Sequence, residues 1–343
     1  MHIQKDKMAE KINNYNGIIN VYKEKGFTSF DVVAKLRGIC EQRKIGHTGT
    51  LDPDATGVLP VCLGNATKVC DLLTDHDKEY EARLLLGIAT DTQDITGEMV
   101  GGTPEVNYDE EVIRRVIMSF VGDIEQVPPM YSALKVNGRK LCDLARKGIE
   151  VERKARPVTI HKIEIFDITS ADEADKGLFG EHIDYISGKK LPVIRMRVHC
   201  SKGTYIRTLC DDIGSKLGCG GTMLTLERTK VGPFVLNGAM KLAEIQAVKE
   251  AGELAKLVMP ADSLFADCVP MQVSPDAEKL LRNGNVLTKG QLIKMDADPV
   301  GENSVDIGDS KKANRVRVYF RDGTFAGLYC RVNGLYKPEK MFL

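Results

Sequence analysis

Fifteen residues, Gly46 to Pro60, constrain this chain more than any other stretch. Four of the first twelve are glycine or proline, which indicates a loop and not a helix. An apolar run, Val58 to Leu63, follows at once and predicts a buried strand. The only ionisable residues of the stretch are His47, Asp52 and Asp54. A carboxylate on a rigid loop beside a core strand is a common place for chemistry. The simpler alternative is a turn whose aspartates accept hydrogen bonds from nearby backbone amides.

Charge distribution says more about partners than net charge does. The 343 residues suffice for two domains, and they carry 48 basic and 48 acidic side chains. A neutral total predicts no polyanionic partner, so a nucleic-acid surface must come from local excess. Residues 135–162 supply one, with nine Lys or Arg against three acids. This excess indicates a phosphate-contacting surface, and ordinary solvated charge is the alternative. Lys35, Arg37, Arg43 and Lys44 form a second, weaker candidate.

Cysteine usage and hydropathy indicate a cytoplasmic protein. The nine cysteines are odd in number and contain no C-x-x-C pair, so neither a disulfide framework nor a common zinc site is expected. Reduced thiols fit a cytosolic compartment. No apolar stretch approaches the length that spans a bilayer, so no membrane partner is expected. Residues 1–14 are polar, lack an apolar signal core and predict a flexible tail.

Two local patterns predict helices around the loop. Thr28 and Asp31 have capping-box spacing, and Phe30, Val33, Leu36 and Cys40 follow at helical spacing, which predicts a helix over 29–41. Asn65 is expected to cap a second helix that ends near Leu73. Residues 170–190 are polar and mixed, and they predict an exposed excursion between strands.

Two further residues stand out by their positions. The alternation in 78–86 predicts a strand with Tyr80 on its apolar face, where an ordinary core tyrosine is the alternative. Arg207 falls in the first turn of a predicted helix through Leu217. That end of a helix is unfavourable for a cation, so a carboxylate partner is expected. The residues after 270 form short alternating runs between Gly turns, which predict a small, mostly β domain.

Taken in order, these motifs resemble the tRNA pseudouridine-55 synthase family of the bacterial TruB type. The signature is the Gly46–Pro60 stretch with His47, Asp52 and Gly57 in place. The supporting stretches are Lys78-x-Tyr80, Asp91-Thr-x-Asp94-x-x-Gly97, 129–135, Arg146-x-Gly148, Arg156-Pro157, 203–207 and Leu226-x-Arg228-Thr229. The resemblance covers roughly residues 16 to 265, and the tail is similar to a PUA-like domain.

The resemblance implies an α+β pseudouridine synthase fold with a mixed, mainly antiparallel sheet and a central cleft. It implies a flexible tail over 1–14, a catalytic domain over 15–269 and a small PUA-like domain over 270–343. The implied reaction is isomerisation of the uridine at position 55, in the T-arm stem-loop of tRNA, to pseudouridine. No metal or other cofactor, no obligatory protein partner and a monomeric state are expected. The absence of nucleotide-binding and metal-spacing motifs agrees with this.

Family roles transfer to matching positions. Asp52 resembles the nucleophile, and sequence leaves open whether it attacks C6 or C1′ or first assists loss of a sugar proton. Arg207 resembles the arginine that pairs with this acid. Tyr80 resembles the ring under the flipped uracil, and its hydroxyl is a candidate base at C5. Tyr205 and Leu226 are expected to wall the pocket, and His47 to enter the space that the base leaves. Asp54, at a variable position, is expected to be a solvent-facing or loop-capping residue.

Three alternatives remain at this point. An RNA-binding module without activity would keep the basic surface and the β tail but would not need the set Asp52, Tyr80 and Arg207. A glycosidase or nucleoside hydrolase usually needs two carboxylates about 5 to 10 Å apart, and Asp54 is the only evident second acid. The guide-RNA-dependent relatives that modify rRNA work with partner proteins, whereas the excursion over 91–126 and the basic segment favour a stand-alone tRNA enzyme.

Overall fold

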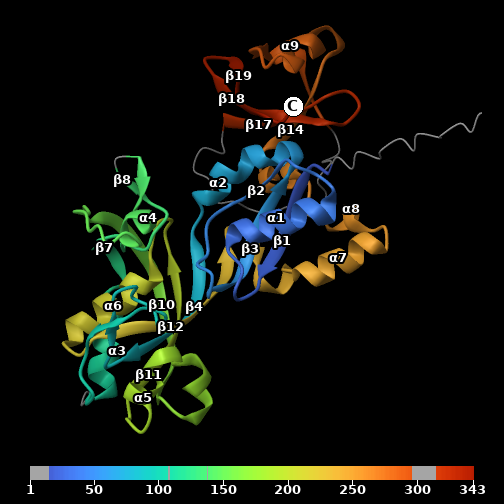
Figure 1. Ribbon diagram of the computed structural model, residues 1–343. Coiled ribbons are helices and arrows are strands. Elements are labelled where there is room, and N and C mark those ends of the chain that lie inside the picture. The colour runs from blue at the N-terminus through green and yellow to red at the C-terminus, as the bar shows by residue number, and fades with distance from the viewer. Residues whose placement is uncertain (1–14, 107–108, 137, 296–313) are drawn as a thin grey trace, which may run out of the picture. The chain divides into compact units, whose positions relative to one another are not determined.

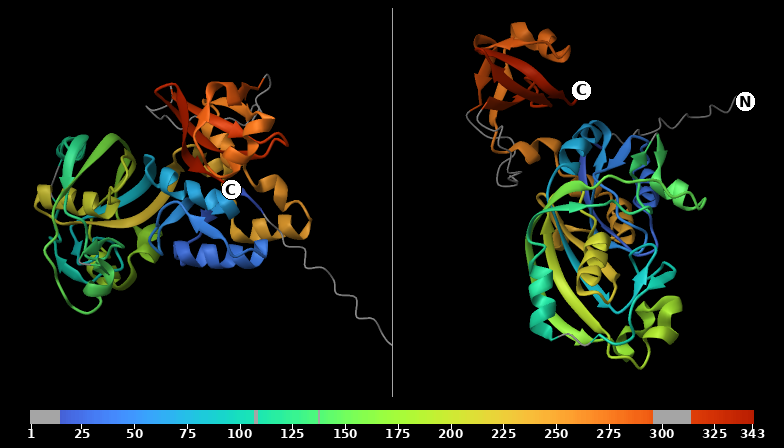
Figure 2. Two further views of the ribbon diagram at one scale, coloured as in Figure 1. Left: turned by 90° about the horizontal axis from the view of Figure 1, so that it is seen from above. Right: turned by 90° about the vertical axis from the view of Figure 1, so that its left-hand side faces the viewer.

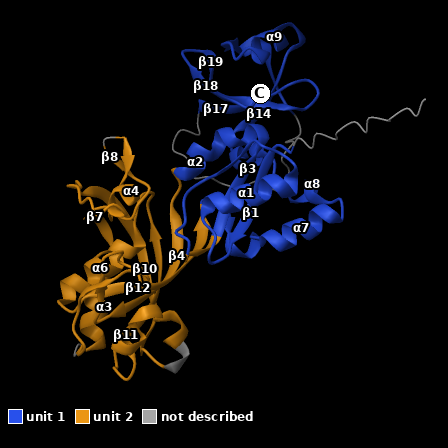
Figure 3. Ribbon diagram, viewed as in Figure 1, with its two compact units in different colours: residues 1–53, 58–74, 232–343 blue, residues 54–57, 75–231 orange. Residues whose placement is uncertain are grey.

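The computed structural model describes residues 15–106, 109–136, 138–295 and 314–343 (Figure 1). They form two compact units (Figure 3). Unit 1 comprises the described parts of 1–53, 58–74 and 232–343, and unit 2 comprises those of 54–57 and 75–231. The tail expected over 1–14 lies outside the described residues. Within the described ranges, no helix has the length and apolar character needed to cross a membrane.

Unit 2 is built on an antiparallel sheet with the strand order β12-β4-β11-β10-β7. These strands are β4 (Lys78–Leu86), β7 (Gly122–Gln126), β10 (Arg156–Ser170), β11 (Pro192–Cys200) and β12 (Gly221–Val231). The start of β3 (Thr56–Leu63) pairs parallel with β12 through Thr56 and Gly57. The sheet is therefore mixed and mainly antiparallel, as predicted. Short ribbons join β5 (Ala89–Thr90) to β6 (Met99–Gly101) and β8 (Lys135–Val136) to β9 (Arg139–Lys140).

Unit 2 also contains helices and 3-10 turns. They are α3 (Glu110–Met118), α4 (Leu141–Ala145), η2 (Glu173–Leu178), η3 (Gly180–His182), α5 (Ile183–Ile186) and α6 (Ile206–Leu217). Helix α6 packs against β12 and β4 and begins and ends as its spacing predicted. The excursion over 170–190 lies between β10 and β11, as predicted, but the prediction that it is exposed fails for some of its apolar side chains. Phe179 and Ile186 are 2% and 1% exposed and pack in one cluster with Leu85 and Val193.

The first part of unit 1 surrounds the signature loop. It contains β1 (Gly17–Lys23), α1 (Ser29–Cys40), β2 (Ile45–His47), most of β3, η1 (Gly64–Val69), α2 (Cys70–Thr74), β13 (Phe234–Val235), η4 (Leu236–Gly238), α7 (Leu242–Glu250), α8 (Leu254–Leu257) and η5 (Ala261–Phe265). The predicted capping box of α1 is present, with Thr28 and Asp31 bonded to each other's backbone amides. Helix α1 packs beside α7 over a shared apolar core (Figures 1 and 2).

Asn65 does not cap a helix, so that prediction is wrong. The 3-10 turn η1 begins one residue earlier, at Gly64, and no side chain caps it. The Asn65 amide donates to Asn16 Oδ1 at 2.8 Å, and the Asn65 side chain accepts from Lys44 at 2.7 Å. The Asn65 side chain, whose oxygen would have accepted a bond in a helix cap, therefore bonds a residue that is distant in sequence.

The last part of unit 1 is a six-stranded sheet with the order β15-β19-β18-β17-β14-β16. Its elements are β14 (Val269–Val273), η6 (Pro275–Ala277), α9 (Glu278–Arg282), β15 (Leu287–Thr288), η7 (Lys289–Gln291), β16 (Leu292–Lys294), β17 (Arg315–Tyr319), β18 (Phe325–Val332) and β19 (Leu335–Met341). The sheet has its own buried cluster around Val318, Ala326 and Tyr329. The mostly β character predicted for this end is confirmed, and the domain boundary near residue 270 stays a prediction.

Candidate active site

The backbone on both sides of Asp52 is held by other parts of unit 1. The Leu51 amide donates to the Ser29 hydroxyl oxygen at 2.9 Å, and Ser29 is the first residue of α1. The Pro53 carbonyl accepts from the Gly26 amide at 2.9 Å. Asp52 lies between these two anchored residues, so little freedom remains for its backbone.

A buried lysine reinforces the second anchor. Lys23 ends β1 and is 0% exposed. Its ammonium donates to the carbonyls of Pro53 at 3.0 Å, Phe27 at 2.5 Å and Glu24 at 3.2 Å. A buried ammonium is costly unless oxygens replace its water, and these carbonyls do so. Lys23 thus ties the end of β1 to the residue that follows Asp52.

The three ionisable residues of the loop differ in their surroundings. Asp52 is half-buried, whereas Asp54 is exposed, as expected for a solvent-facing residue. His47 ends β2, pairs with Val61 of β3 and is half-buried. Its Nδ1 accepts a hydrogen bond from the Gly49 amide at 3.3 Å. The other polar atom of the imidazole ring is Nε2. Asp52 is therefore the more sheltered of the two loop carboxylates.

Tyr80 and Leu226 share one face of the unit 2 sheet. Tyr80 of β4 pairs with Arg228 of β12, and Leu226 pairs with Ala82, so the side chains of these two pairs point to the same side. Tyr80 and Leu226 are each 8% exposed. The Tyr80 hydroxyl is hydrogen-bonded to the guanidinium of Arg228, which is 1% exposed. Burial lowers the pKa of Arg228, and its contact with Tyr80 opposes that shift.

Gly57 of the signature allows β3 to approach this strand pair. Its φ is +103°, a conformation that favours glycine. A Cβ at this position would lie 2.2 Å from the Arg228 carbonyl oxygen. Since Gly57 pairs with Arg228 in the parallel ladder, only glycine fits without a backbone shift. The signature loop therefore ends against the residue that contacts Tyr80.

Arg207 is buried in the first turn of α6, and the carboxylate predicted beside it is found in Asp94. The two side chains approach to 3.6 Å, and Arg207 is 5% exposed. Arg207 also donates to the Tyr131 carbonyl at 2.8 Å and to the Thr92 carbonyl at 3.5 Å. These partners fix the guanidinium within unit 2. The pairing of Arg207 with Asp52 that the resemblance implied stays a prediction.

Tyr205 immediately precedes α6, and its backbone is fixed by Gln126 at the end of β7. The Tyr205 amide donates to Gln126 Oε1 at 3.0 Å, and Gln126 Nε2 donates to the Tyr205 carbonyl at 3.2 Å. Gln126 is 2% exposed and Tyr205 is half-buried. These two hydrogen bonds fix the backbone of the residue that precedes α6, and therefore the position of Arg207 in the first turn of that helix.

The six candidates divide between the units. His47 and Asp52 belong to unit 1, and Tyr80, Tyr205, Arg207 and Leu226 belong to unit 2. Within unit 2 the structure places Tyr80 and Leu226 on one sheet face, as the alternation predicted for Tyr80. Among the residues that the structure describes, one group of at least three metal-ligating side chains lies together, Asp77, His161 and His199. It contains none of the six candidates.

The basic segment 135–162 is mostly solvent-facing. Eight of its nine cations are exposed, and the ninth, Arg153, is half-buried. Arg153 donates to the Pro128 carbonyl at 3.1 Å and lies 3.6 Å from Glu150, so part of its role is structural. It also lines a pocket of about 550 Å³ with Tyr131, Asp91 and other residues of unit 2. The exposed cations remain suited to contact phosphates.

Sequence reasoning missed the residues that hold the candidates in place. The sequence patterns assigned no individual role to Lys23, Asp94, Gln126 or Arg228. Asp94 and Arg228 stand inside quoted motifs, and the search for an acid partner of Arg207 could have singled out Asp94. Lys23 and Gln126 act through carbonyl or amide contacts with residues 30 and 79 positions away. No local pattern reports such contacts.

Comparisons with known proteins give one consistent result. Residues 37–206 match the model described as TruB family pseudouridylate synthase (N terminal domain), and residues 207–266 match tRNA pseudouridylate synthase B C-terminal domain. A Lachnoclostridium phytofermentans protein named tRNA pseudouridine synthase B is 48% identical, covering 96% of this chain and 100% of that protein. Proteins of the same name from Clostridium perfringens and Clostridium tetani are 42% and 38% identical, covering 96% of this chain and 99% and 100% of their own.

Solved structures agree on the fold. The structure of a Cbf5–Nop10–Gar1 complex matches with a TM-score of 0.65 at 24% identity, covering 100% of this chain and 91% of that one. An archaeal box H/ACA Nop10–Cbf5 complex matches with a TM-score of 0.61 at 24% identity, covering 98% and 89%. These likenesses confirm the predicted pseudouridine synthase fold.

Proposed function

Because this chain belongs to the TruB family of pseudouridylate synthases, we propose that it acts on the uridine at position 55 in the T-arm loop of tRNA. The protein is a tRNA pseudouridine synthase, an isomerase that converts uridine to pseudouridine. In this reaction the C1′–N1 bond breaks, the uracil turns, and a C1′–C5 bond forms. C5 loses its proton and N1 gains one, so no atom is added or removed overall. The position in tRNA rests on family membership.

Asp52 is proposed as the nucleophile. A carboxylate can hold one half of the cleaved substrate while the other half turns, which makes covalent catalysis suitable here. The single observation that carries the proposal is the anchoring of Leu51 and Pro53 on either side of a half-buried Asp52. Such preorganisation lets a side chain meet its target without further ordering. Whether Asp52 attacks C6 or C1′, or first assists loss of a sugar proton, is left open.

Tyr80, Leu226 and Tyr205 are proposed to hold the flipped uracil. A base stacked in a folded loop must be extruded at a cost of a few kcal/mol, and stacking on an aromatic ring offsets part of that cost. Tyr80 and Leu226 offer neighbouring aromatic and apolar surface on one sheet face. The Arg228 guanidinium beside the Tyr80 hydroxyl would stabilise the phenolate form of Tyr80, which is the form that can accept the C5 proton.

Arg207 and His47 complete the proposed machinery. A guanidinium presents five N–H donors, so Arg207 can pair with Asp94 and with a second carboxylate. Pairing with Asp52 would favour the ionised form that a nucleophile needs. His47, on the same loop as Asp52, is proposed to fill the space that the extruded base leaves. The exposed cations of residues 135–162 are proposed to contact phosphates without reading sequence.

The enzyme is further proposed to work in the cytoplasm as a monomer, without a cofactor or an obligatory protein partner. Its support is the reaction, which requires no redox or metal chemistry, and the resemblance to stand-alone tRNA enzymes. Light scattering at assay concentration measures the oligomeric state directly. A dimer under conditions of full activity would overturn the monomer proposal.

Tritium release tests the function and the nucleophile together. A T-arm stem-loop RNA with tritium at C5 of its uridines is incubated with the wild type, Asp52→Asn and Asp54→Asn. We expect release by the wild type and the exposed-residue control, and none by Asp52→Asn with RNA binding retained. A second RNA with cytidine at position 55 should release no tritium. Release from that RNA would contradict the proposed position, and release by Asp52→Asn would contradict the proposed nucleophile.

A further inference from the structure

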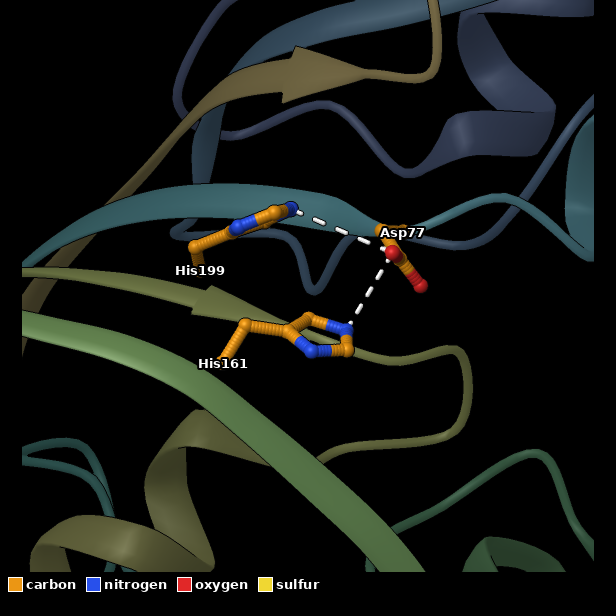
Figure 4. Close-up of side chains that lie close together, drawn as sticks. All are labelled: Asp77, His161 and His199. Carbon is orange, nitrogen blue, oxygen red and sulfur yellow. Dashed lines mark ion pairs between the residues drawn. The ribbon is translucent and has the colours of Figure 1, made fainter. Parts of the chain in front are cut away.

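Three side chains from neighbouring strands of unit 2 converge outside the proposed machinery (Figure 4). Asp77 immediately precedes β4, His199 lies on β11, and His161 lies on β10, which is the next strand of the sheet. Asp77 Oδ2 lies 3.2 Å from His161 Nε2 and 4.0 Å from His199 Nε2. The two imidazole centroids are 4.8 Å apart.

Strand register brings these side chains to one place. His199 pairs with Glu79 on β4 and with Lys162 on β10. His161 falls at a shift of register between Ile160 and Lys162, an irregularity of the kind that re-aims a side chain. Because Val198 is the residue that pairs with Tyr80, His199 points to the opposite face of the sheet. The cluster is therefore separated from the proposed uracil pocket by the sheet itself.

We propose that Asp77, His161 and His199 bind one divalent transition-metal ion, with Zn²⁺ as the best fit. Two imidazole nitrogens and one carboxylate oxygen are the donor set that Zn²⁺ accepts. All three donor atoms lie within 4.8 Å of one another. Ligand atoms around tetrahedral zinc are about 3.3 Å apart when the bonds are about 2.0–2.1 Å long. Asp77 Oδ2 and His161 Nε2, 3.2 Å apart, already have that spacing, and His199 Nε2, 4.0 Å from Asp77 Oδ2, would move closer on binding.

The exposure of the cluster suits an open coordination site. The side chains of Asp77, His161 and His199 are 50%, 35% and 42% exposed. Water can therefore occupy the remaining coordination position, and the ion does not need to be buried. A bound ion would link β10 and β11 to the residue before β4, so its role is to stabilise the sheet and not to take part in isomerisation. A pH-dependent ion pair without metal is the competing explanation.

Zinc binding to the full chain tests the proposal. The protein is kept reduced with a non-chelating phosphine, because all nine of its cysteines, each in a described range, are free thiols. Calorimetry should give one tight site per chain in the wild type and in the control His182→Gln. The double variant His161→Ala/His199→Ala should lose this site, and Asp77→Asn should weaken it at least about tenfold. Unchanged pseudouridine formation shows that each variant is folded.

Two further measurements identify the ligands. Co²⁺ bound in place of Zn²⁺ should show ligand-field bands without a thiolate charge-transfer band, and the double variant should show neither. Zinc should raise the unfolding temperature of the wild type but not of the double variant. The proposal is overturned if the wild type binds no zinc at neutral pH. It is also overturned if the double variant keeps wild-type affinity or if the Co²⁺ spectrum shows thiolate ligands.

Discussion

Replacing Lys23 by methionine tests whether the buried lysine positions Asp52. Methionine has nearly the length of lysine and no charge, so it can fill the same buried space. The substitution removes the ammonium that bonds the carbonyls of Pro53, Phe27 and Glu24. Lys23 is 0% exposed, so it has no surface to offer to RNA. We expect an effect on catalysis to pass through the carbonyls that Lys23 bonds, of which Pro53 is next to Asp52.

The expected magnitudes follow from these contacts. Each hydrogen bond to a charged group contributes about 1.5–3 kcal/mol, and removing the cost of burying the ammonium cancels much of the sum. We expect the free energy of unfolding to fall by about 2–4 kcal/mol. The Pro53 carbonyl keeps its bond to the Gly26 amide, so the displacement of Asp52 should stay below about 1 Å. A displacement of that size costs up to about 100-fold in rate, so kcat should fall by about 10- to 100-fold with KM nearly unchanged.

Single-turnover tritium release and urea unfolding measure the two effects separately. Lys25→Met is the matched control, because Lys25 is exposed and lies two residues away. Its kcat and stability should stay near those of the wild type. Suppose that Lys23→Met loses stability but keeps kcat within about twofold of the control. The lysine would then support the fold alone, and the reasoning that links it to Asp52 would be refuted.

Other predictions concern strain, pH and charge. Gly57→Ala should lower the free energy of unfolding, measured in urea, by about 2–4 kcal/mol, because it adds a backbone clash to a positive φ. The control Gly252→Ala, with φ +76° and open space around it, should lower it by about 1–2 kcal/mol. Equal losses would show that the close approach of Gly57 to Arg228 is unimportant. Burial, and to a smaller extent the neighbouring Asp211, raises the pKa of Asp212 to about 6. The contribution of Asp212 to the free energy of unfolding is therefore fully present below about pH 3.9, and it is lost as the pH rises through 6. Asp212→Asn should therefore stabilise the protein by about 1 kcal/mol at pH 7.5, after allowance for partial exposure, and not at pH 4; an equal gain at both values would contradict this assignment. Reversing charge at the exposed Lys147 and Lys154 should raise KM and reduce the salt slope of binding by about 1.4–1.8 with kcat preserved, and an unchanged slope would remove these residues from the RNA surface.

Patterns with a local cause were predictable from sequence. The capping box of α1 needs only Thr28 and Asp31, three residues apart, and the structure contains it. Alternation placed Tyr80 on the buried face of β4. The rule against a cation at a helix N-terminus predicted an acid beside Arg207, and Asp94 lies there. For the capping box and for Tyr80 the local sequence carried the whole physical reason, whereas the identity of the acid beside Arg207 depended on the fold.

Predictions failed where local spacing did not decide which residues are buried or which groups they bond. Phe30 has helical spacing with the buried residues of α1, but it is 63% exposed and lies against Arg37. Asn65 bonds Lys44 and Asn16 instead of a helix end. Phe179 and Ile186 of the 170–190 excursion are buried although they follow no helical or strand period, because short turns carry them. Periodicity reports regular elements and is silent about irregular ones.

The residues that hold Asp52 and Arg207 in place belong to the same compact unit as the residue they hold. Asp52 is held from α1 and β1, which belong to its own unit, and Arg207 is held by Asp94 and the Tyr131 carbonyl in the other unit. Each half of the proposed machinery is therefore ordered by the folding of its own unit. The conformational entropy of the backbone at Asp52 and of the Arg207 side chain is lost during folding, so tRNA binding does not need to order them. Binding free energy can then be used to extrude the uridine, the costly step that the reaction requires.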